Sequence, residues 1–387
     1  MYNLIGDLYM KKIGIIAEFN PFHNGHLYLI NEIKKIFPDS LIVAIISTNF
    51  TQRGDFSFLT KWDKTRICLK NNIDLVIEIP TLFATQGSDV FSHYAVSVLE
   101  YLNIDYLVFG SESGDIDILK QLASTSLYNK EYDKLVKEYL KLGNSYPSST
   151  SKALFNLTNI KLINSNDILG VSYIKTIMLN EYNIEPICIK RTNNYLNKKT
   201  SGNISSATSI RELYINNKDI KDYVPLITNK LINIDRNYLD NYFKILKYKL
   251  ITEINNLNIY LDVSEGIDNK IKKVILEVNN YHDLIDRLKS KRYTYNRLNR
   301  MFIHILLNIK KDYKYDINYI RVLGFNNKGR SYIKEMKNEI TLPIITNYKN
   351  IDDEVLYIEK IATITYVNII NRSDLIKEEL MSAPINI

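Results

Sequence analysis

The chain has 387 residues, of which 45% are hydrophobic and 24% are charged. A chain of this length and composition can bury substantial cores and would ordinarily form two or three domains. The formal net charge of +7 favours a polyanionic partner but is modest for a dedicated nucleic-acid-binding protein. Composition therefore indicates a soluble globular protein and leaves its partner open.

The cysteine content and the hydropathy of the sequence indicate in which cellular compartment the protein is found. The two cysteines, Cys68 and Cys188, exclude a disulfide framework and a C-x-x-C zinc pattern. The sequence has no apolar run of about 18 residues and no basic segment at its start. We therefore expect a cytoplasmic protein with no membrane segment. Met10 directly precedes a strand-like stretch, so Met1 to Tyr9 are assigned no role.

Short β-branched, apolar runs recur through the first third of the chain, as expected for strands buried on both faces. They are Ile13 to Ala17, Leu41 to Ile46, Ile73 to Ile77 and Tyr106 to Phe109. Helical patterns lie between them, such as the apolar stripe formed by Leu29, Ile30, Ile33, Ile36 and Phe37. This alternation predicts an α/β fold with a doubly wound parallel sheet.

The pattern changes after the fourth predicted strand. We predict helical sequence over Asp115 to Leu142, a Ser-rich loop over Ser145 to Ser151, a helix over Asp167 to Glu181 and a strand over Ile184 to Lys190. The α/β domain is expected to span residues 10–215, and a mainly helical region residues 216–312. Residues 313–387 are expected to form a small C-terminal α+β part, with short strands at Ile320 to Leu323 and Ile361 to Ile369.

The most informative segment runs from Gly14 to His26, with the sequence Gly-Ile-Ile-Ala-Glu-Phe-Asn-Pro-Phe-His-Asn-Gly-His. It leads from a buried strand, through a turn, into the start of a helix. In open α/β sheets ligands bind at the carboxyl ends of strands, where helix N-termini attract anions. His23 and His26 flank Asn24-Gly25, so two imidazoles can stabilise the charge that builds on an α-phosphate when pyrophosphate is displaced.

This segment resembles the HxGH motif of the nucleotidylyltransferase superfamily, which pairs it with a second motif near the end of the domain. The stretch Ile204-Ser-Ser-Ala-Thr-Ser-Ile-Arg211 resembles that second motif. We expect Ser205 or Ser206 to cap a helix, Ser209 to face the β- and γ-phosphates, and Arg211 to neutralise the leaving pyrophosphate. Taken alone, the segment could equally be an ordinary Ser/Thr helix cap.

Further segments narrow the resemblance to one family. They are Glu18 to Tyr28, Asn49 to Gly54, Lys61-Trp62, Asp74 to Pro80, Ala84 to Gln86, Phe109 to Ser113, Asn166 to Gly170, Ile189 to Arg191 and Ser206 to Arg211. Together they resemble the bacterial tRNA(Met) cytidine acetate ligase family. One departure is Thr48, where the family pattern would have glycine.

The resemblance implies a two-step reaction. Acetate and ATP first give enzyme-bound acetyl-adenylate and pyrophosphate; the acetyl group then passes to the wobble cytidine of elongator tRNA(Met), giving N4-acetylcytidine and AMP. The implied ligands are ATP together with Mg²⁺, acetate, and elongator tRNA(Met). No bound organic cofactor, no metal ligand from the protein and no protein partner are expected.

The resemblance also assigns an ATP site to one continuous stretch and three single residues. The stretch comprises Ile16, Ala17, Glu18, Phe19, Asn20, Pro21, Phe22, His23, Asn24, Gly25, His26, Leu27, Tyr28 and Leu29. At Gly110, which ends the fourth strand, a side chain would block the nucleotide. Asn166 can hydrogen-bond the nucleotide and Arg191 can meet a phosphate.

Two further groups of residues are candidates for the other substrates. Asn49, Gln52 and Arg53 follow the second strand and could line an acetate pocket, although a loop arginine is often only solvated. The segment Arg287 to Arg300 holds six basic residues and no acidic one. We predict tRNA contacts from Lys291, Arg292, Arg297 and Arg300, with a solvated helix face as the alternative.

Two other functions share part of this pattern. A metabolite adenylyltransferase has both motifs but usually stops near the end of the α/β domain, whereas this chain continues for about 170 residues. A non-catalytic RNA-binding protein with a vestigial nucleotide site would not need the intact residues His23, His26, Ser206, Ser209 and Arg211. The acetate-dependent ligase is therefore the favoured hypothesis.

Overall fold

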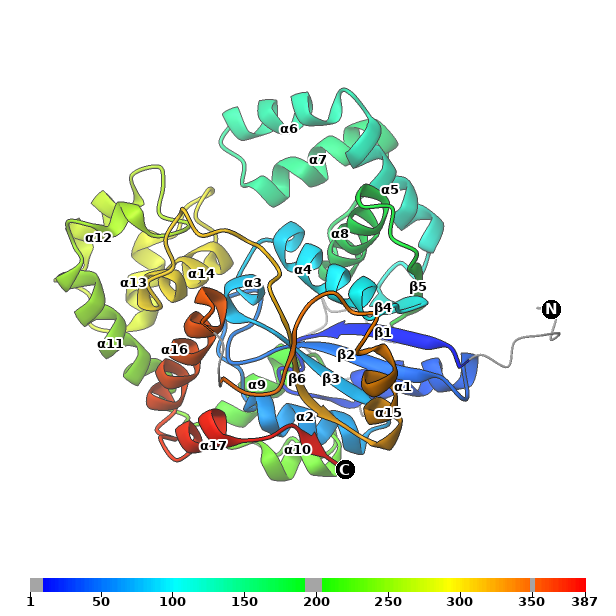
Figure 1. Cartoon of the computed structure of the whole chain (residues 1–387). Coiled ribbons are helices and arrows are strands. Elements are labelled where there is room, and N and C mark those ends of the chain that lie inside the picture. The colour runs from blue at the N-terminus through cyan, green and yellow to red at the C-terminus, as the bar shows by residue number, and fades with distance from the viewer. Residues whose placement is uncertain (1–9, 192–203, 349–351) are drawn as a thin grey trace.

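The computed structural model describes residues 10–191, 204–348 and 352–387 (Figure 1). Met1 to Tyr9 lie outside these residues. No helix within the described ranges is long and apolar enough to span a membrane.

The centre of the fold is one sheet with the strand order β5-β4-β1-β2-β3-β6-β7, with β8 paired to β6. The strands are β1 (Lys12–Ala17), β2 (Leu41–Ser47), β3 (Leu75–Ile79), β4 (Tyr106–Ser111), β5 (Glu185–Lys190), β6 (Ile320–Phe325), β7 (Ile344–Ile345) and β8 (Ile385–Asn386). The first five strands pair in parallel. Every residue of β2 and β3 is buried, as their continuous apolar runs require. The predicted α/β fold with a doubly wound parallel sheet is confirmed.

Helices surround this sheet along the first half of the chain. They are α1 (Asn24–Ile36), α2 (Lys61–Lys70), α3 (Thr81–Ala84), α4 (Ser88–Tyr101), α5 (Ile116–Tyr128), α6 (Tyr132–Lys141), α7 (Tyr146–Thr158), α8 (Ser165–Leu179) and α9 (Ala207–Ile215). In Figure 1 the α6–α7 hairpin stands away from the sheet. The predicted loop over Ser145 to Ser151 is wrong, because these residues begin α7: Ser145 caps the helix by accepting from Ser148 N–H, and Pro147 lies in its first turn.

The segment after α9 is helical up to Leu306, as predicted. It contains α10 (Leu226–Leu231), α11 (Tyr238–Thr252), the short 3-10 helix η1 (Leu257–Ile259), α12 (Ile267–Val274), α13 (Tyr281–Leu288) and α14 (Tyr295–Leu306). Helices α11 to α14 gather on one side of the sheet in Figure 1.

The C-terminal part combines strands and helices, and it returns to the sheet. It contains β6, α15 (Asn327–Met336), β7, α16 (Glu354–Ile369), α17 (Leu375–Met381) and β8. Strand β6 pairs antiparallel with β3, so this part extends the sheet of the first domain. The strand predicted at Ile361 to Ile369 is wrong, since these residues form the second half of α16. Burial of the helix against the core overrides their β-branched preference.

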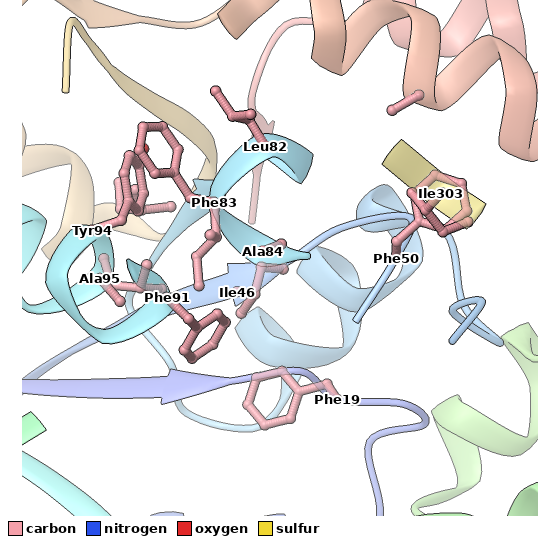
Figure 2. Close-up of a cluster of buried hydrophobic side chains, with 14 of the residues drawn as sticks. Phe19, Ile46, Phe50, Leu82, Phe83, Ala84, Phe91, Tyr94, Ala95 and Ile303 are labelled. Carbon is pink, nitrogen blue, oxygen red and sulfur yellow. The ribbon is translucent and has the colours of Figure 1, made fainter. Parts of the chain in front are cut away.

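A hydrophobic core joins these parts around the end of β1. Figure 2 shows Phe19 after β1 and Phe50 after β2 beside side chains of α3 and α4, with Ile303 of α14 close to Phe50. Phe83 and Tyr94 stack with ring centroids 4.3 Å apart. Because α14 contributes to this core, the helical region is fixed relative to the carboxyl ends of the strands.

A buried ion cluster also ties the C-terminal part to the sheet. It consists of Lys61, Glu78, Arg321, Glu359 and Glu379, whose side chains are 0–2% exposed. Lys61 Nζ lies 2.7 Å from Glu78 Oε1, 2.8 Å from Glu359 Oε1 and 2.9 Å from Glu379 Oε1. Arg321 Nη1 lies 2.9 Å from Glu379 Oε1 and 3.2 Å from Glu78 Oε2. The cluster therefore connects α2, β3, β6, α16 and α17.

Candidate nucleotide-binding site

A cavity of about 1290 Å³ opens at the carboxyl ends of β1, β4 and β5. Its walls also include the first turns of α1, α4, α8 and α9, the turn between α6 and α7, and residues on either side of the α14 N-terminus. Pockets for a single drug-sized ligand have volumes of about 300–1,000 Å³. The cavity therefore has room for a nucleotide and for part of a second substrate.

Most of the predicted site residues line this cavity. They are Ile16, Ala17, Glu18, Phe19, Asn20, Gly25, His26, Tyr28, Leu29, Gln52, Arg53, Gly110, Asn166, Arg191, Ser206, Arg211, Arg292, Arg297 and Arg300. The others do not line it: Pro21, Phe22, His23, Asn24, Leu27, Asn49, Ser209 and Lys291. The fold thus brings together segments that lie far apart in the sequence.

The two motif histidines form a stacked pair at the start of α1. Their ring centroids are 3.7 Å apart and the rings are inclined by 21°. His23 caps α1, since its Nδ1 accepts from Gly25 N–H at 3.0 Å. The backbone N–H of His23 donates to His26 Nδ1 at 3.1 Å. His26 lines the cavity, whereas His23 is 1% exposed and lies behind it.

These contacts fix which imidazole nitrogens carry hydrogen. Because Nδ1 of each ring accepts from a backbone N–H, a neutral ring carries its hydrogen on Nε2. Burial and the nearby charge of Arg191 lower the pKa of His23 to about 3. Burial, followed by His23 and Arg191, lowers the pKa of His26 well below its usual value. Both rings are therefore neutral at physiological pH and act as Nε2–H donors.

Gly25 is required by the close approach of His23 to the backbone. A Cβ atom at this position would lie 2.8 Å from His23 Cε1 and 3.0 Å from its Nδ1. Any side chain here would displace the His23 ring, and with it the capping bond to Gly25 N–H. The glycine of the motif thus serves the packing of the histidine, in addition to leaving the cavity open.

The second motif places another helix N-terminus at the cavity. Ser206 caps α9, and its Oγ accepts from Ser209 N–H at 3.1 Å, as predicted for one of the two serines. The Ser209 hydroxyl lies 2.9 Å from Ser206 Oγ and away from the cavity. Arg211 donates from Nη1 to the Asn20 carbonyl at 2.8 Å. This last bond joins the two motifs directly.

The β4 end holds Asn166 in place. Gly110 lies in β4 beside Arg191, whose Cγ would be 3.4 Å from a Cβ at Gly110. Asn166 Nδ2 donates to Glu112 Oε1 at 2.6 Å, and the other oxygen of this carboxylate accepts from Asp167 N–H at 3.2 Å. One N–H of the Asn166 amide is used in this bond, which leaves its second N–H and its carbonyl oxygen for a ligand.

The candidates for an acetate pocket separate into two places. Gln52 lines the cavity; its backbone N–H donates to Glu18 Oε1 at 2.6 Å, and its Nε2 donates to the Gln86 carbonyl at 2.7 Å. Arg53 lines the cavity as well. Asn49 is 2% exposed and donates to Thr363 Oγ1 at 2.8 Å, beside the buried ion cluster. Thr48, where the family pattern would have glycine, donates there to Glu359 Oε1 at 2.8 Å.

Arginines of the predicted RNA-binding segment lie on the same cavity. The loop after β2 holds α14 close: a Cβ at Gly54, where φ is +76°, would lie 2.6 Å from Arg300 N. Asn299 Nδ2 also donates to Asp55 Oδ1 at 3.0 Å. Arg292, Arg297 and Arg300 line the wall, while Lys291 is exposed outside it.

Lys64 is a buried residue that supports the strand ends behind the cavity, and the sequence did not reveal it. Its Nζ donates to the carbonyls of Glu18, Ser47 and Thr48 at 2.7, 2.9 and 3.0 Å. Three acceptors match the three N–H groups of an ammonium, so protonated Lys64 ties together the ends of β1 and β2. Burial lowers the pKa of Lys64 to about 7. Nothing in the local sequence distinguishes this lysine from one on the surface of a helix, so its burial could not be predicted.

Asp262 and His304 are two further residues that the sequence did not single out. Asp262 lines the cavity and lies 3.4 Å from His304 Nδ1. Within the part of the chain that the structure describes, no group of three or more His, Cys, Asp or Glu side chains could hold a metal ion.

Comparison with known proteins places these features in context. The family model described as HIGH Nucleotidyl Transferase matches residues 10–380. A tRNA(Met) cytidine acetate ligase of Anoxybacillus flavithermus is 36% identical over 400 residues, covering 97% of this chain and 100% of the relative. The corresponding protein of Caldicellulosiruptor saccharolyticus is 38% identical and covers 86% of each chain.

Solved structures of Thermotoga maritima TmcAL have the same fold. The apo form has a TM-score of 0.88 at 29% identity, covering 98% of this chain and 100% of that one. The form bound with alpha-thio ATP has a TM-score of 0.86 over the same shares of both chains.

Proposed function

Because the chain belongs to the tRNA(Met) cytidine acetate ligase family, we propose that it acetylates the wobble cytidine of elongator tRNA(Met) in two steps. In the first, an acetate oxygen attacks the α-phosphate of ATP and pyrophosphate leaves. In the second, the N4 amine attacks the acetyl carbon, AMP leaves and N4-acetylcytidine is formed. The observation that carries the proposal is the assembly of both motifs, Arg191 and Gly110 around one cavity.

The histidine pair supplies the donors for the first step. His26 faces the cavity with its Nε2–H, which is suited to an oxygen of the α-phosphate as negative charge builds there. His23 Nε2 is buried and has no hydrogen-bond partner among the described residues. Because this ring lies behind His26 and does not line the cavity, its part in the step is to hold the His26 ring in position. Since both rings are neutral, they stabilise charge as it develops and do not hold a preformed ion pair with ATP.

The leaving pyrophosphate would be stabilised from two helices and two arginines. The free N–H groups at the starts of α1 and α9 attract anions. Arg191 and Arg211 line the same cavity and can form charge-assisted hydrogen bonds with phosphate oxygens. Mg²⁺ would enter with ATP, because the phosphate oxygens supply hard ligands of the kind that this ion prefers.

Acetate and tRNA are assigned to the remaining walls. We place the acetate carboxylate near Gln52 and Arg53 and leave out Asn49, whose amide contacts Thr363. Arg292, Arg297 and Arg300 are assigned to RNA phosphates; Lys291 lies outside the cavity and has no special place in the proposal. Arginine suits this role because its planar group binds phosphate at two points.

An exchange assay tests the proposal. Incorporation of labelled pyrophosphate into ATP should require acetate and proceed without RNA, because adenylation precedes transfer. Addition of elongator tRNA(Met) should then give one N4-acetylcytidine at the wobble position, detected by nucleoside analysis. Exchange that ignores acetate but responds to a phosphopantetheine or a mononucleotide would favour a metabolite adenylyltransferase and overturn the proposal.

A further inference from the structure

Two acidic residues, Asp262 and Glu265, lie on the wall of the cavity that α14 helps to form. Glu265 Oε2 lies between two arginines, 3.7 Å from Arg292 Nη1 and 3.8 Å from Arg297 Nη1, whereas Asp262 faces a histidine. Asp262 lies between η1 and α12, and its own backbone has a φ of +64°, an uncommon conformation that aspartate tolerates better than most residues. Its side chain is 25% exposed and lines the cavity together with Arg297 and Arg300. Asp262 Oδ2 lies 3.8 Å from Arg300 Nε, which is too far for a hydrogen bond. The carboxylate is thus held near a cation and keeps the capacity to accept from a ligand.

His304 lies directly behind this carboxylate. Its Nε2 must donate, because its partner at 2.8 Å is the carbonyl oxygen of Thr85, which can only accept. Burial lowers the pKa of His304 and keeps the ring neutral, so Nδ1 carries a lone pair and no hydrogen. This Nδ1 lies 3.4 Å from Asp262 Oδ2 and has no hydrogen-bond donor among the described residues. His304 Nδ1 and Asp262 Oδ2 are therefore two acceptors that face each other, and one proton can be shared between them.

A chain of bonds connects Asp262 to the strand that carries the HxGH motif. Glu18, at the end of β1, accepts from Gln52 N–H, and Gln52 Nε2 donates to the Gln86 carbonyl. The neighbouring Thr85 carbonyl accepts from His304, which contacts Asp262. Glu18 and Gln52 line the cavity, and Gln86 and His304 are buried behind them, so these contacts link the nucleotide wall to the Asp262 wall.

We propose that Asp262 binds the exocyclic amine of the cytidine and accepts its proton during acetyl transfer. This inference rests on the proposed function and assigns the nucleobase subsite within it. A carboxylate is the side-chain group that accepts from cytosine N4. Arg292, Arg297 and Arg300 surround the position with positive charge suited to the flanking phosphates.

The proton balance of the second step explains why both Asp262 and His304 are needed. The amine nitrogen forms a bond to the acetyl carbon, and the bond from that carbon to the AMP oxygen breaks, so AMP departs with its negative charge. The nitrogen must then lose one proton, which passes to the Asp262 carboxylate. The protonated carboxyl group can donate to His304 Nδ1, which stabilises the proton after transfer.

The first test is the variant Asp262→Asn, whose amide oxygen can still accept from the amine but cannot take its proton. The ratio of acetyl transfer to acetate-dependent exchange should fall by roughly 10²-fold or more. The matched control is Asp283→Asn, an acidic residue of α13 that pairs with Arg287 and lies outside the cavity. A ratio within about threefold of wild type would overturn the assignment of Asp262, whereas loss of acetate dependence in the wild type would overturn the function itself.

The second test needs no variant and reads binding instead of turnover. The wild type should bind tRNA(Met) with cytidine at the wobble position roughly tenfold more tightly than the same RNA with uridine, whose O4 faces the carboxylate as a second acceptor. Asp262→Asn should remove this preference, because its amide can donate to O4. Equal affinity of the wild type for the two RNAs would overturn the proposal even if the variant failed to fold.

Discussion

His23 lies directly behind His26, with the two rings stacked 3.7 Å apart and the His23 N–H bound to His26 Nδ1. The buried ring thus supports the one that faces the cavity, and the same N–H fixes the hydrogen of His26 on Nε2. The pair acts as one unit, because a change at either residue alters the ring presented to the nucleotide.

Replacement of either histidine by alanine should lower the adenylation rate by roughly 10²-fold or more, while the affinity for ATP changes much less. The reason is that the neutral donors act mainly on charge that develops during the reaction. Acetate-dependent pyrophosphate exchange and equilibrium binding of ATP measure the two effects. His93→Ala, an exposed histidine of α4, is the control. If the ATP dissociation constant changed by the whole factor and turnover by none, the histidines would be ground-state ligands.

The pKa of His23 also predicts how stability depends on pH. The ordinary histidine pKa of 6.5 is lowered to about 3 for His23 in the folded protein. Below about pH 6.5, His23 therefore binds a proton in the unfolded chain but stays neutral in the folded protein. Folding should therefore lose about 2 kcal/mol from this residue between about pH 6.5 and pH 5. In urea titrations, His23→Gln should flatten this part of the stability curve relative to wild type. A slope identical to that of wild type would mean that His23 is not neutral by burial.

Where the sequence predicted the fold, local patterns decided the structure. The parallel strands were predicted correctly because a strand that is buried on both faces has a continuous apolar sequence, which is easy to recognise. The loop predicted at Ser145 to Ser151 was wrong because serine and proline mark helix starts as well as loops. The strand predicted at Ile361 to Ile369 was wrong because residues far away in the sequence form the core around this segment, and that core favours a helix.

The same distinction applies to the candidate site. Motif residues such as His26 and Arg211 were identified from sequence because strand-to-helix junctions carry local cues. Asp262 and Lys64 were missed, since their roles come from contacts across the chain: Lys64 joins two strand ends, and Asp262, in the connection between η1 and α12, contacts His304 of α14. No spacing in the sequence encodes either contact.

Lys61→Met should destabilise the protein by about 3–5 kcal/mol, because it leaves the buried carboxylates of Glu359 and Glu379 without their main cation. The effect should be greatest on α17, whose amide hydrogens should exchange faster, since Glu379 holds this helix to Lys61 and Arg321. Urea unfolding and hydrogen exchange measure the two effects, with Lys137→Met on the exposed face of α6 as the control. A loss below about 1 kcal/mol would show that the cluster is replaceable by apolar contacts.

Arg292, Arg297 and Arg300 line the cavity, whereas Lys291 of the same basic segment does not, and this difference allows a matched test of RNA binding. Changing the three arginines together to glutamine should weaken tRNA binding and flatten its dependence on salt, because fewer counterions are released on association. Lys291→Gln removes one charge from an exposed position and should change both quantities much less. Acetate-dependent exchange should fall less than tRNA affinity in the triple variant, since the three arginines come from the segment around α14 and belong to neither the HxGH motif nor the Ser206 to Arg211 segment. Binding at two salt concentrations, exchange and acetyl transfer should be measured on the same preparations. An unchanged salt slope in the triple variant would place the RNA surface elsewhere, and equal loss of exchange and binding would mean that these arginines support the adenylation site itself.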